Sequence, residues 1–190
     1  EEGSLLINYN GHGSEDGWTD EKLLTIEQLI KWRNLTNLPV FLTATCEFGR
    51  YDNPNVVSGA ELALLNPQGG AIALLTTTRP VYATSNFLLN EAFYQSITPA
   101  ARLGDIMQKT KNASVSGVLN RNFSLLGDPS MAIALPPNEV KIKTINGQSP
   151  ENSILKALDK VVIQGEVTNP KLSEGTVEVI LFDKPAKLKT

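Results

Sequence analysis

Cysteine and histidine are almost absent from this sequence: the 190 residues include one of each, Cys46 and His12. A single cysteine excludes an intramolecular disulfide, and there is no cysteine pair that could bind a metal ion through thiolates. Long apolar runs are also missing, since no segment reaches the roughly 18 uninterrupted apolar residues that a membrane-spanning helix needs. The first residues, Glu1 to Leu6, lack the basic start of a signal peptide. This sequence is therefore expected to have no internal disulfide and no membrane-spanning helix.

An excess of positive charge is missing as well. Lys and Arg number 17 against 20 Asp and Glu, so the net charge is -3, and the two signs are interspersed. Nucleic acids and anionic membranes attract basic surfaces, so we expect no nucleic-acid partner. Hydrophobic residues make up 41% of the chain, enough for one large core or two small ones.

The first part of the chain alternates short apolar runs with helical patterns. Thr25 with Gln28, and Ser58 with Glu61, have the spacing of capping boxes that open helices. The expected strands cover residues 4–9, 38–45, 71–75 and 131–135, and further helices cover residues 86–95 and 104–112. Continuously apolar strands separated by helices predict an α/β fold with a doubly wound parallel sheet covered on both faces.

After Pro136 and Pro137 the pattern changes to alternating runs at residues 140–145, 160–167 and 176–182. Alternation of this kind predicts a small antiparallel β-sandwich domain. A complete sandwich has about seven strands, so we expect only part of one here. The predicted domains are residues 1–136 and 137–190. Because the chain opens almost directly into an apolar strand, we also expect it to be an excised piece of a larger protein.

His12 and Cys46 each fall at the carboxyl end of an expected buried strand. They lie 34 positions apart (46 - 12), which leaves room for the helical crossover that joins parallel strands. Neighbouring parallel strands end at one edge of a sheet, and in open α/β sheets ligands bind at that edge. We therefore predict that the two side chains face a common cleft.

This pair of residue types fits nucleophilic catalysis. A thiolate is the reactive form of cysteine, and an imidazole can take the thiol proton or protonate a leaving group. Acyl transfer also needs hydrogen-bond donors for the developing oxyanion, which the backbone N–H groups of Gly13 and Cys46 can supply. The predicted catalytic residues are His12, Cys46 and Gly13. The alternative is that Cys46 is a core residue and His12 a turn residue.

Other residues near the two strand ends are weaker candidates for substrate binding. Asn10 could instead satisfy a turn, and Glu47 could be a solvated carboxylate or a partner that orients His12. Three more candidates lie in loops after expected strands, where a packing role is equally plausible: Trp18, Arg79 and Tyr82. An acidic cluster lacks the regular spacing of a calcium loop, so no metal is predicted; its members are Glu15, Asp16, Asp20 and Glu21.

Three short motifs resemble one known family. They are Asn-Gly-His-Gly at residues 10–13, Thr-Ala-Thr-Cys-Glu-Phe at 43–48 and Leu-Leu-Gly-Asp-Pro-Ser at 125–130. Together they are similar to the gingipain-type cysteine peptidases, whose fold is caspase-like. The resemblance covers roughly residues 4–136, and the β region that follows is similar to the immunoglobulin-like domain of that family.

More narrowly, residues 8–13 with Trp18, 58–62 and 70–82 resemble the PorU-type surface sortases of the type IX secretion system. This resemblance implies removal of the carboxy-terminal sorting domain from secreted cargo, with transfer of the acyl group to an amine of a surface glycolipid. It implies the outer membrane surface of a Bacteroidetes-type bacterium as location, other secretion-system proteins as partners, and no cofactor. Carried over, His12 and Cys46 match the dyad and Gly13 the oxyanion position.

The resemblance also implies that two strands should precede the histidine strand, so the cleft of this chain is expected to be incomplete. Two other functions remain open: a gingipain-like endopeptidase that releases its product to water, and a non-catalytic scaffold or adaptor of a secretion complex that retains the peptidase fold.

Overall fold

The computed structural model describes residues 3–19, 21–136, 139–156, 158–168 and 176–180. The chain divides into two compact units, Glu1–Leu135 and Pro136–Thr190. Each unit is described by itself.

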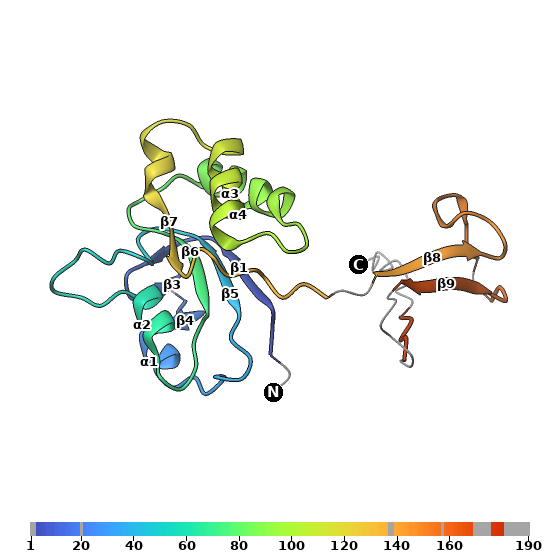
Figure 1. The fold of residues 1–190 in the computed structure, drawn as a ribbon, viewed down its shortest axis with the longest axis horizontal. Helices are drawn as coiled ribbons and strands as arrows, with labels where there is room; N and C mark the ends of the chain where they lie inside the picture. The colour runs from blue at the N-terminus through green and yellow to red at the C-terminus, as the bar shows by residue number, and fades with distance from the viewer. Residues whose placement is uncertain (1–2, 20, 137–138, 157, 169–175, 181–190) are drawn as a thin grey trace, which may run out of the picture. The chain divides into compact units, whose positions relative to one another are not determined.

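A four-stranded sheet with the order β1-β5-β6-β7 forms the centre of the first unit (Figure 1). Its strands are β1 (Leu6–Asn10), β5 (Val40–Ala44), β6 (Ala73–Thr77) and β7 (Phe123–Gly127). The first three run parallel to one another, and each lies within two residues of its predicted position. The sheet is mixed, because β7 runs antiparallel to β6 with Leu126 opposite Leu74.

The position and direction of the last strand differ from the prediction. Residues 131–135 form no strand, and only an isolated bridge joins Ala132 to Arg102. The strand lies instead before the Gly127-Asp128-Pro129 turn. Two helices, α3 (Ala83–Ser96) and α4 (Leu103–Ala113), and the 3₁₀ helix η1 (Val118–Asn122) lie between β6 and β7, whereas one α-helix lies between each pair of parallel strands. The second helix returns the chain to the edge where β6 ends, so β7 starts there, with Phe123 opposite Thr77, and runs antiparallel.

Helices cover both faces of the sheet, as predicted. The short helices α1 (Ile26–Leu29) and α2 (Gly59–Leu65) lie on one face, and α3 (Ala83–Ser96) and α4 lie on the other (Figure 1). Side chains alternate along β5, so Val40 and Leu42 join the core under α3 and α4. Phe41 joins the core under α1 and α2. Both predicted capping boxes are present, at α1 and at α2.

Directly after His12 the chain forms a second sheet that the sequence did not predict. Its three short antiparallel strands are β2 (Gly13–Ser14), β3 (Gly17–Trp18) and β4 (Leu24–Thr25). This sheet fixes the backbone that follows the histidine.

In the second unit, β8 (Glu139–Ile145) pairs antiparallel with β9 (Ile163–Thr168), and the 3₁₀ helix η2 (Pro150–Asn152) lies between them in sequence. These strands agree with the alternating runs at 140–145 and 160–167. The third expected strand is not found, because residues 176–180 have no regular structure; the rest of that run, Leu181 and Phe182, lies outside the described residues. The immunoglobulin-like sandwich stays a prediction.

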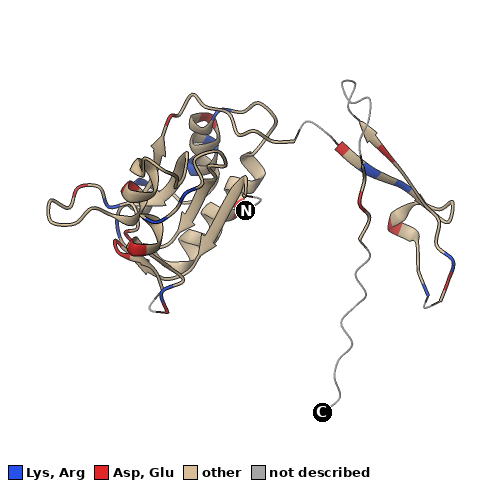
Figure 2. Ribbon diagram, turned by 90° about the horizontal axis from the view of Figure 1, so that it is seen from below, with Lys and Arg blue, Asp and Glu red and all other residues tan. Residues whose placement is uncertain are grey.

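Charged residues of both signs are interspersed along the first unit, as Figure 2 shows. No helix in the described ranges is both long enough and apolar enough to span a membrane.

Candidate active site

The pairing of β1 with β5 puts His12 and Cys46 at the same level of one sheet edge. Asn10 is the register partner of Ala44, an offset of 34 positions (44 - 10), which equals the separation of His12 from Cys46 (46 - 12). The Gly11 N–H extends the ladder by donating to Ala44 O at 3.3 Å. His12 is exposed and Cys46 is partly exposed. Both residues are therefore open to a ligand bound at this edge.

The backbone of His12 is held from two sides. Its carbonyl oxygen accepts hydrogen bonds from the Tyr9 hydroxyl at 2.7 Å and from the Thr19 N–H at 3.0 Å. The Tyr9 ring stacks on Trp18 with centroids 4.4 Å apart. Burial, and secondarily the charge of Glu21, raises the pKa of Tyr9, which keeps the hydroxyl protonated as a donor.

Gly13 is in position to donate its backbone N–H. Thr19 N–H donates to His12 O, and antiparallel pairs alternate between bonded and non-bonded, so Gly13 and Trp18 form a non-hydrogen-bonded pair. The Gly13 N–H thus points away from β3. A Cβ at Gly13 would lie 2.3 Å from Thr45 Oγ1, so this close approach requires glycine.

The Cys46 loop begins where β5 ends. The Thr45 carbonyl accepts a hydrogen bond from the buried Thr77 hydroxyl, which ties the loop to β6. The Cys46 thiol lies 3.6 Å from the Val81 carbonyl oxygen, to which it can donate. Among the described residues the Cys46 N–H has no acceptor, so it is available to a developing oxyanion beside Cys46.

Glu47 follows the cysteine in a strained backbone conformation. Its φ of 53° lies in the left-handed region, which costs a non-glycine residue about 1–2 kcal/mol. Arg50 offsets the strain with two interactions, a 3.0 Å hydrogen bond from its N–H to the Glu47 carbonyl and a 3.0 Å ion pair to the Glu47 carboxylate. The carboxylate thus pairs with Arg50, and the structure shows no hydrogen bond between it and His12.

The other candidate residues have different surroundings. Trp18 was expected in a loop but lies in β3, 8% exposed, because its ring fills the core between Tyr9 and Phe41. This burial favours the packing role. Arg79 pairs with Asp52, with Nη1 2.9 Å from Oδ1. This pair lowers the pKa of Asp52 and raises that of Arg79, mainly through the hydrogen bond.

Two candidates are open at the edge of the sheet. Tyr82 is 70% exposed and stands at the start of α3, one residue after Val81. Asn10 is exposed as the last residue of β1, and it precedes Gly11 and His12. Both side chains flank the loops that carry His12 and Cys46.

Comparison with known proteins identifies the family. The sequence model described as peptidase family C25 matches residues 1–134. The chain belongs to peptidase family C25. The resemblance to gingipain-type peptidases is thereby confirmed at the level of the family. Among curated protein sequences, none matches this C25 chain.

Solved structures agree on the fold of this C25 chain. The Arg specific cysteine proteinase gingipain R has a TM-score of 0.58 and 20% identity, over 74% of this chain and 36% of that one. A complex of the Porphyromonas gingivalis RgpB pro- and mature domains has a TM-score of 0.63 and 21% identity, over 74% and 37%. The C25 chain therefore shares the mixed α/β, caspase-like fold of gingipain R and spans a little over a third of these structures' length.

The described members of the acidic cluster of the C25 chain include Glu15, which binds other side chains. Glu15 pairs with Arg50 and accepts a hydrogen bond from Asn53, whereas Asp20 lies outside the described residues. The pKa of Glu21 is lowered by its own backbone N–H, then by Thr19 and by the charge of His12. Within the described ranges, no group of three or more His, Cys, Asp or Glu residues could hold a metal ion.

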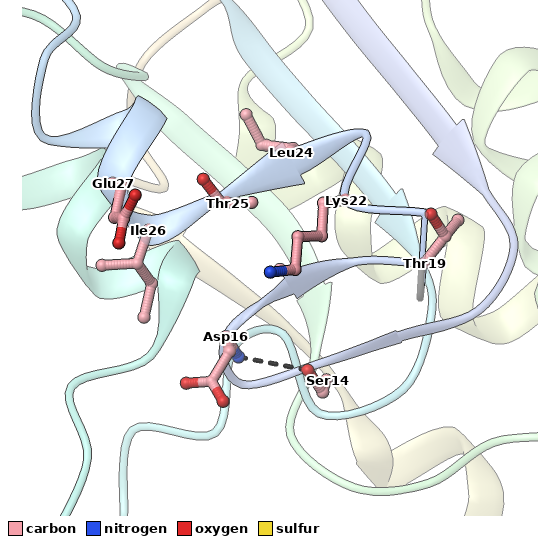
Figure 3. Close-up of a pocket in the computed structure, with 9 residues that line it drawn as sticks. Ser14, Asp16, Thr19, Lys22, Leu24, Thr25, Ile26 and Glu27 are labelled. Carbon is pink, nitrogen blue, oxygen red and sulfur yellow. Dashed lines mark hydrogen bonds between the residues drawn. The ribbon is translucent and has the colours of Figure 1, made fainter.

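A shallow pocket of about 270 Å³ lies on the small sheet that follows His12 (Figure 3). Its lining includes Ser14, Asp16 and Lys22, and the Asp16 N–H donates to the Ser14 hydroxyl at 3.2 Å. None of the described residues that line it is a predicted site residue. Neither His12 nor Cys46 lines it.

Sequence reasoning missed four residues that shape the C25 site: Tyr9, Arg50, Asp52 and Val81. Tyr9 stands three residues before His12, and aromatic residues beside a Gly-His-Gly turn are a signal that could have been followed. Arg50 and Asp52 lie in a loop of mixed charge, and no spacing rule predicts which partners such a loop selects.

Proposed function

We propose that this chain carries the catalytic dyad of a cysteine peptidase or transpeptidase, with Cys46 as nucleophile and His12 as its proton-transfer partner. The observation that carries the proposal is the register of β1 and β5, which brings the sole histidine and the sole cysteine to one level. Membership of family C25 supports the same chemistry. The N–H groups of Gly13 and Cys46 are the proposed oxyanion donors.

In the proposed reaction the Cys46 thiolate attacks a peptide carbonyl and forms a C–S bond, while the carbonyl electrons move onto oxygen. The two backbone N–H groups stabilise this oxyanion. When the C–N bond breaks, His12 gives a proton to the departing amine. The resulting thioester is resolved by water or by an acceptor amine, which restores the thiol.

The proposed substrate is secreted cargo with a carboxy-terminal sorting domain, and the proposed acceptor is an amine of a surface glycolipid or water. The similarity of residues 8–13, 58–62 and 70–82 to PorU-type sortases supports this choice. The proposed location is the outer membrane surface of a Bacteroidetes-type bacterium, with other secretion-system proteins as partners. Asn10 and Tyr82 are the proposed substrate contacts, because both are exposed beside the dyad.

The test compares wild type with Cys46→Ala in the full-length protein, using one cargo protein. We expect Cys46→Ala to abolish removal of the sorting domain while leaving the melting temperature close to that of wild type. Unchanged processing would refute the proposal. Mass spectrometry of the new carboxyl end then identifies the reaction, because a free acid indicates hydrolysis and an attached amine indicates transpeptidation.

One observation favours a second function, that of a non-catalytic scaffold in a secretion complex. The Cys46 thiol is partly buried and lies 3.6 Å from the Val81 carbonyl, an arrangement that also suits a structural cysteine. In that case Cys46→Ala would still bind its partners and would support cargo processing as well as wild type does.

A further inference from the structure

Arg50 lies at the centre of an ion-pair network beside Cys46. Its Nη1 is 3.0 Å from a carboxylate oxygen of Glu15 and 3.0 Å from one of Glu47, and its Nε is 3.8 Å from Asp52 Oδ1. Asp52 also accepts hydrogen bonds from both terminal nitrogens, Nη1 and Nη2, of Arg79. One arginine thus contacts three carboxylates, and the third of these holds a second arginine.

The network joins the three loops that surround Cys46. Glu15 lies in the β2–β3 turn, three residues after His12; Glu47 and Asp52 lie in the loop that carries Cys46; and Arg79 lies in the loop after β6. The loop of Arg79 continues to Val81, whose carbonyl faces the Cys46 thiol at 3.6 Å. A movement of any of these loops would therefore change the surroundings of the thiol.

Two further hydrogen bonds hold Glu15 in place. The Glu15 carbonyl accepts from the Gly59 N–H at 2.8 Å, and the Glu15 carboxylate accepts from Asn53 at 2.7 Å. The Glu15 side chain is only 15% exposed, and that of Arg50 is 37% exposed. Partly buried ion pairs are screened less by solvent than exposed ones. The Glu15 end of the network is therefore better shielded than its Asp52–Arg79 end, where the side chains are 48% and 43% exposed.

We propose that Arg50 is a positioning residue, which holds Cys46 at the working distance from His12 by linking their two loops. The proposal rests on the proposed function, because it assumes that the two side chains react together. The network contains two arginines and three carboxylates, a net charge of -1, so it supplies no positive field to a thiolate. Its contribution is therefore geometric.

The test measures kcat and KM of cargo processing by full-length Arg50→Gln. A misplacement of about 1 Å in an active site can cost about 100-fold in rate. We expect kcat to fall about 10- to 100-fold and KM to change less than about twofold, because the loops move relative to each other while the substrate contacts stay. An unchanged kcat would overturn the proposal.

A matched control is available at the start of α4, where Arg102, the residue before the helix, makes an exposed pair with Asp105 at 2.9 Å. Arg102→Gln removes the same charge and a similar contact away from the three loops, and we expect its kcat and KM to equal those of wild type. If Arg102→Gln lowers kcat as much as Arg50→Gln does, the effect is not positional and the proposal is wrong.

Two further variants separate positioning from folding. Arg50→Lys keeps the charge but lacks the planar fork, so it should recover only part of kcat. Asp52→Asn weakens the link to Arg79 and leaves Glu15 and Glu47 bound to Arg50, so it should lower kcat less than Arg50→Gln and remain folded. If Arg50→Gln is too unstable to assay, Glu15→Gln is measured instead, because it weakens the link from Arg50 to the histidine loop. A Glu15→Gln kcat equal to that of wild type overturns the proposal.

Cys46→Ala in the same assay separates the two proposals. If Cys46→Ala is inactive and Arg50→Gln is as fast as wild type, only the positioning role fails. If Cys46→Ala is as active as wild type, the proposed function itself fails.

Discussion

Gly13→Ala should damage the site mainly through a contact with Thr45. The added Cβ would lie 2.3 Å from Thr45 Oγ1 and 3.0 Å from the carbonyl oxygen of Gly17. Ordinary contact begins at 3.4 Å, so Thr45 and Gly13 must separate by about 1.1 Å (3.4 - 2.3). Thr45 is fully buried and directly precedes Cys46. The separation therefore passes into the distance between the histidine and cysteine loops.

Two magnitudes follow from this displacement. Overpacking by a methyl group should reduce the free energy of unfolding by about 1–3 kcal/mol. A shift of about 1 Å between the reacting groups should lower kcat/KM for cargo processing about 100-fold. The assay is cargo processing by the full-length protein, together with urea denaturation of the same samples.

The control is Gly117→Ala, since Gly117 has a φ of 77° and no atom within 4 Å of its Cβ position. With ψ at -148°, Gly117 lies in a region that essentially only glycine occupies, so the strain should cost about 1–3 kcal/mol in stability without changing kcat/KM. Adding Thr45→Ala to Gly13→Ala removes the clashing hydroxyl and should restore at least about tenfold of the lost activity. Full activity of Gly13→Ala, or a double variant no better than the single one, would refute the reasoning.

Three further outcomes test the fold and the network. Gly70→Ala should lower the free energy of unfolding, measured by urea denaturation, by more than about 3 kcal/mol. The reason is that Gly70 has a φ of 98° and that the added Cβ would lie 1.9 Å from the Ala63 carbonyl oxygen. A smaller loss of stability would contradict this packing. Ser58→Ala removes the capping box of α2 and should cost about 1 kcal/mol, whereas no loss would contradict the cap. The hydrogen bond from Arg79 lowers the pKa of Asp52 in the folded protein below its ordinary value of 3.8. The ionised Asp52 therefore stabilises the folded protein above pH 3.8, and this stabilisation is lost as the pH falls through the lowered pKa of the folded state. Asp52→Asn should therefore flatten the acid limb of melting temperature against pH, and parallel acid limbs would contradict it.

The central strands could be predicted because apolar continuity and crossover length are local properties of the sequence. The same 34-residue spacing that separates His12 from Cys46 became the pairing offset of β1 and β5. The position of β7 was missed because the apolar run at residues 131–135 was taken as the last strand. Its direction was missed although the two predicted helices before it return the chain to the edge where β6 ends. The strands β2, β3 and β4 have two residues each, too few to show a period.

The network around Arg50 could not be predicted for another reason. Arg50 pairs with Glu15, which lies 35 residues before it (50 - 15). Asp52 pairs with both Arg50 and Arg79, and Arg79 lies 29 residues after Arg50 (79 - 50). Such pairing depends on where three loops meet in space, which is set by the sheet order. In contrast, the placement of His12 and Cys46 beside each other needed only the carboxyl ends of two adjacent parallel strands.

The most direct test of the account is the alkylation rate of Cys46 near neutral pH in the folded protein, compared between wild type and His12→Ala. Mass spectrometry of the peptide that contains Cys46 gives this rate without any knowledge of the substrate. If the two residues form a dyad, native Cys46 reacts readily and His12→Ala reacts at least about tenfold more slowly. Equal rates in the two proteins, or a Cys46 that reacts only after unfolding, would contradict the account.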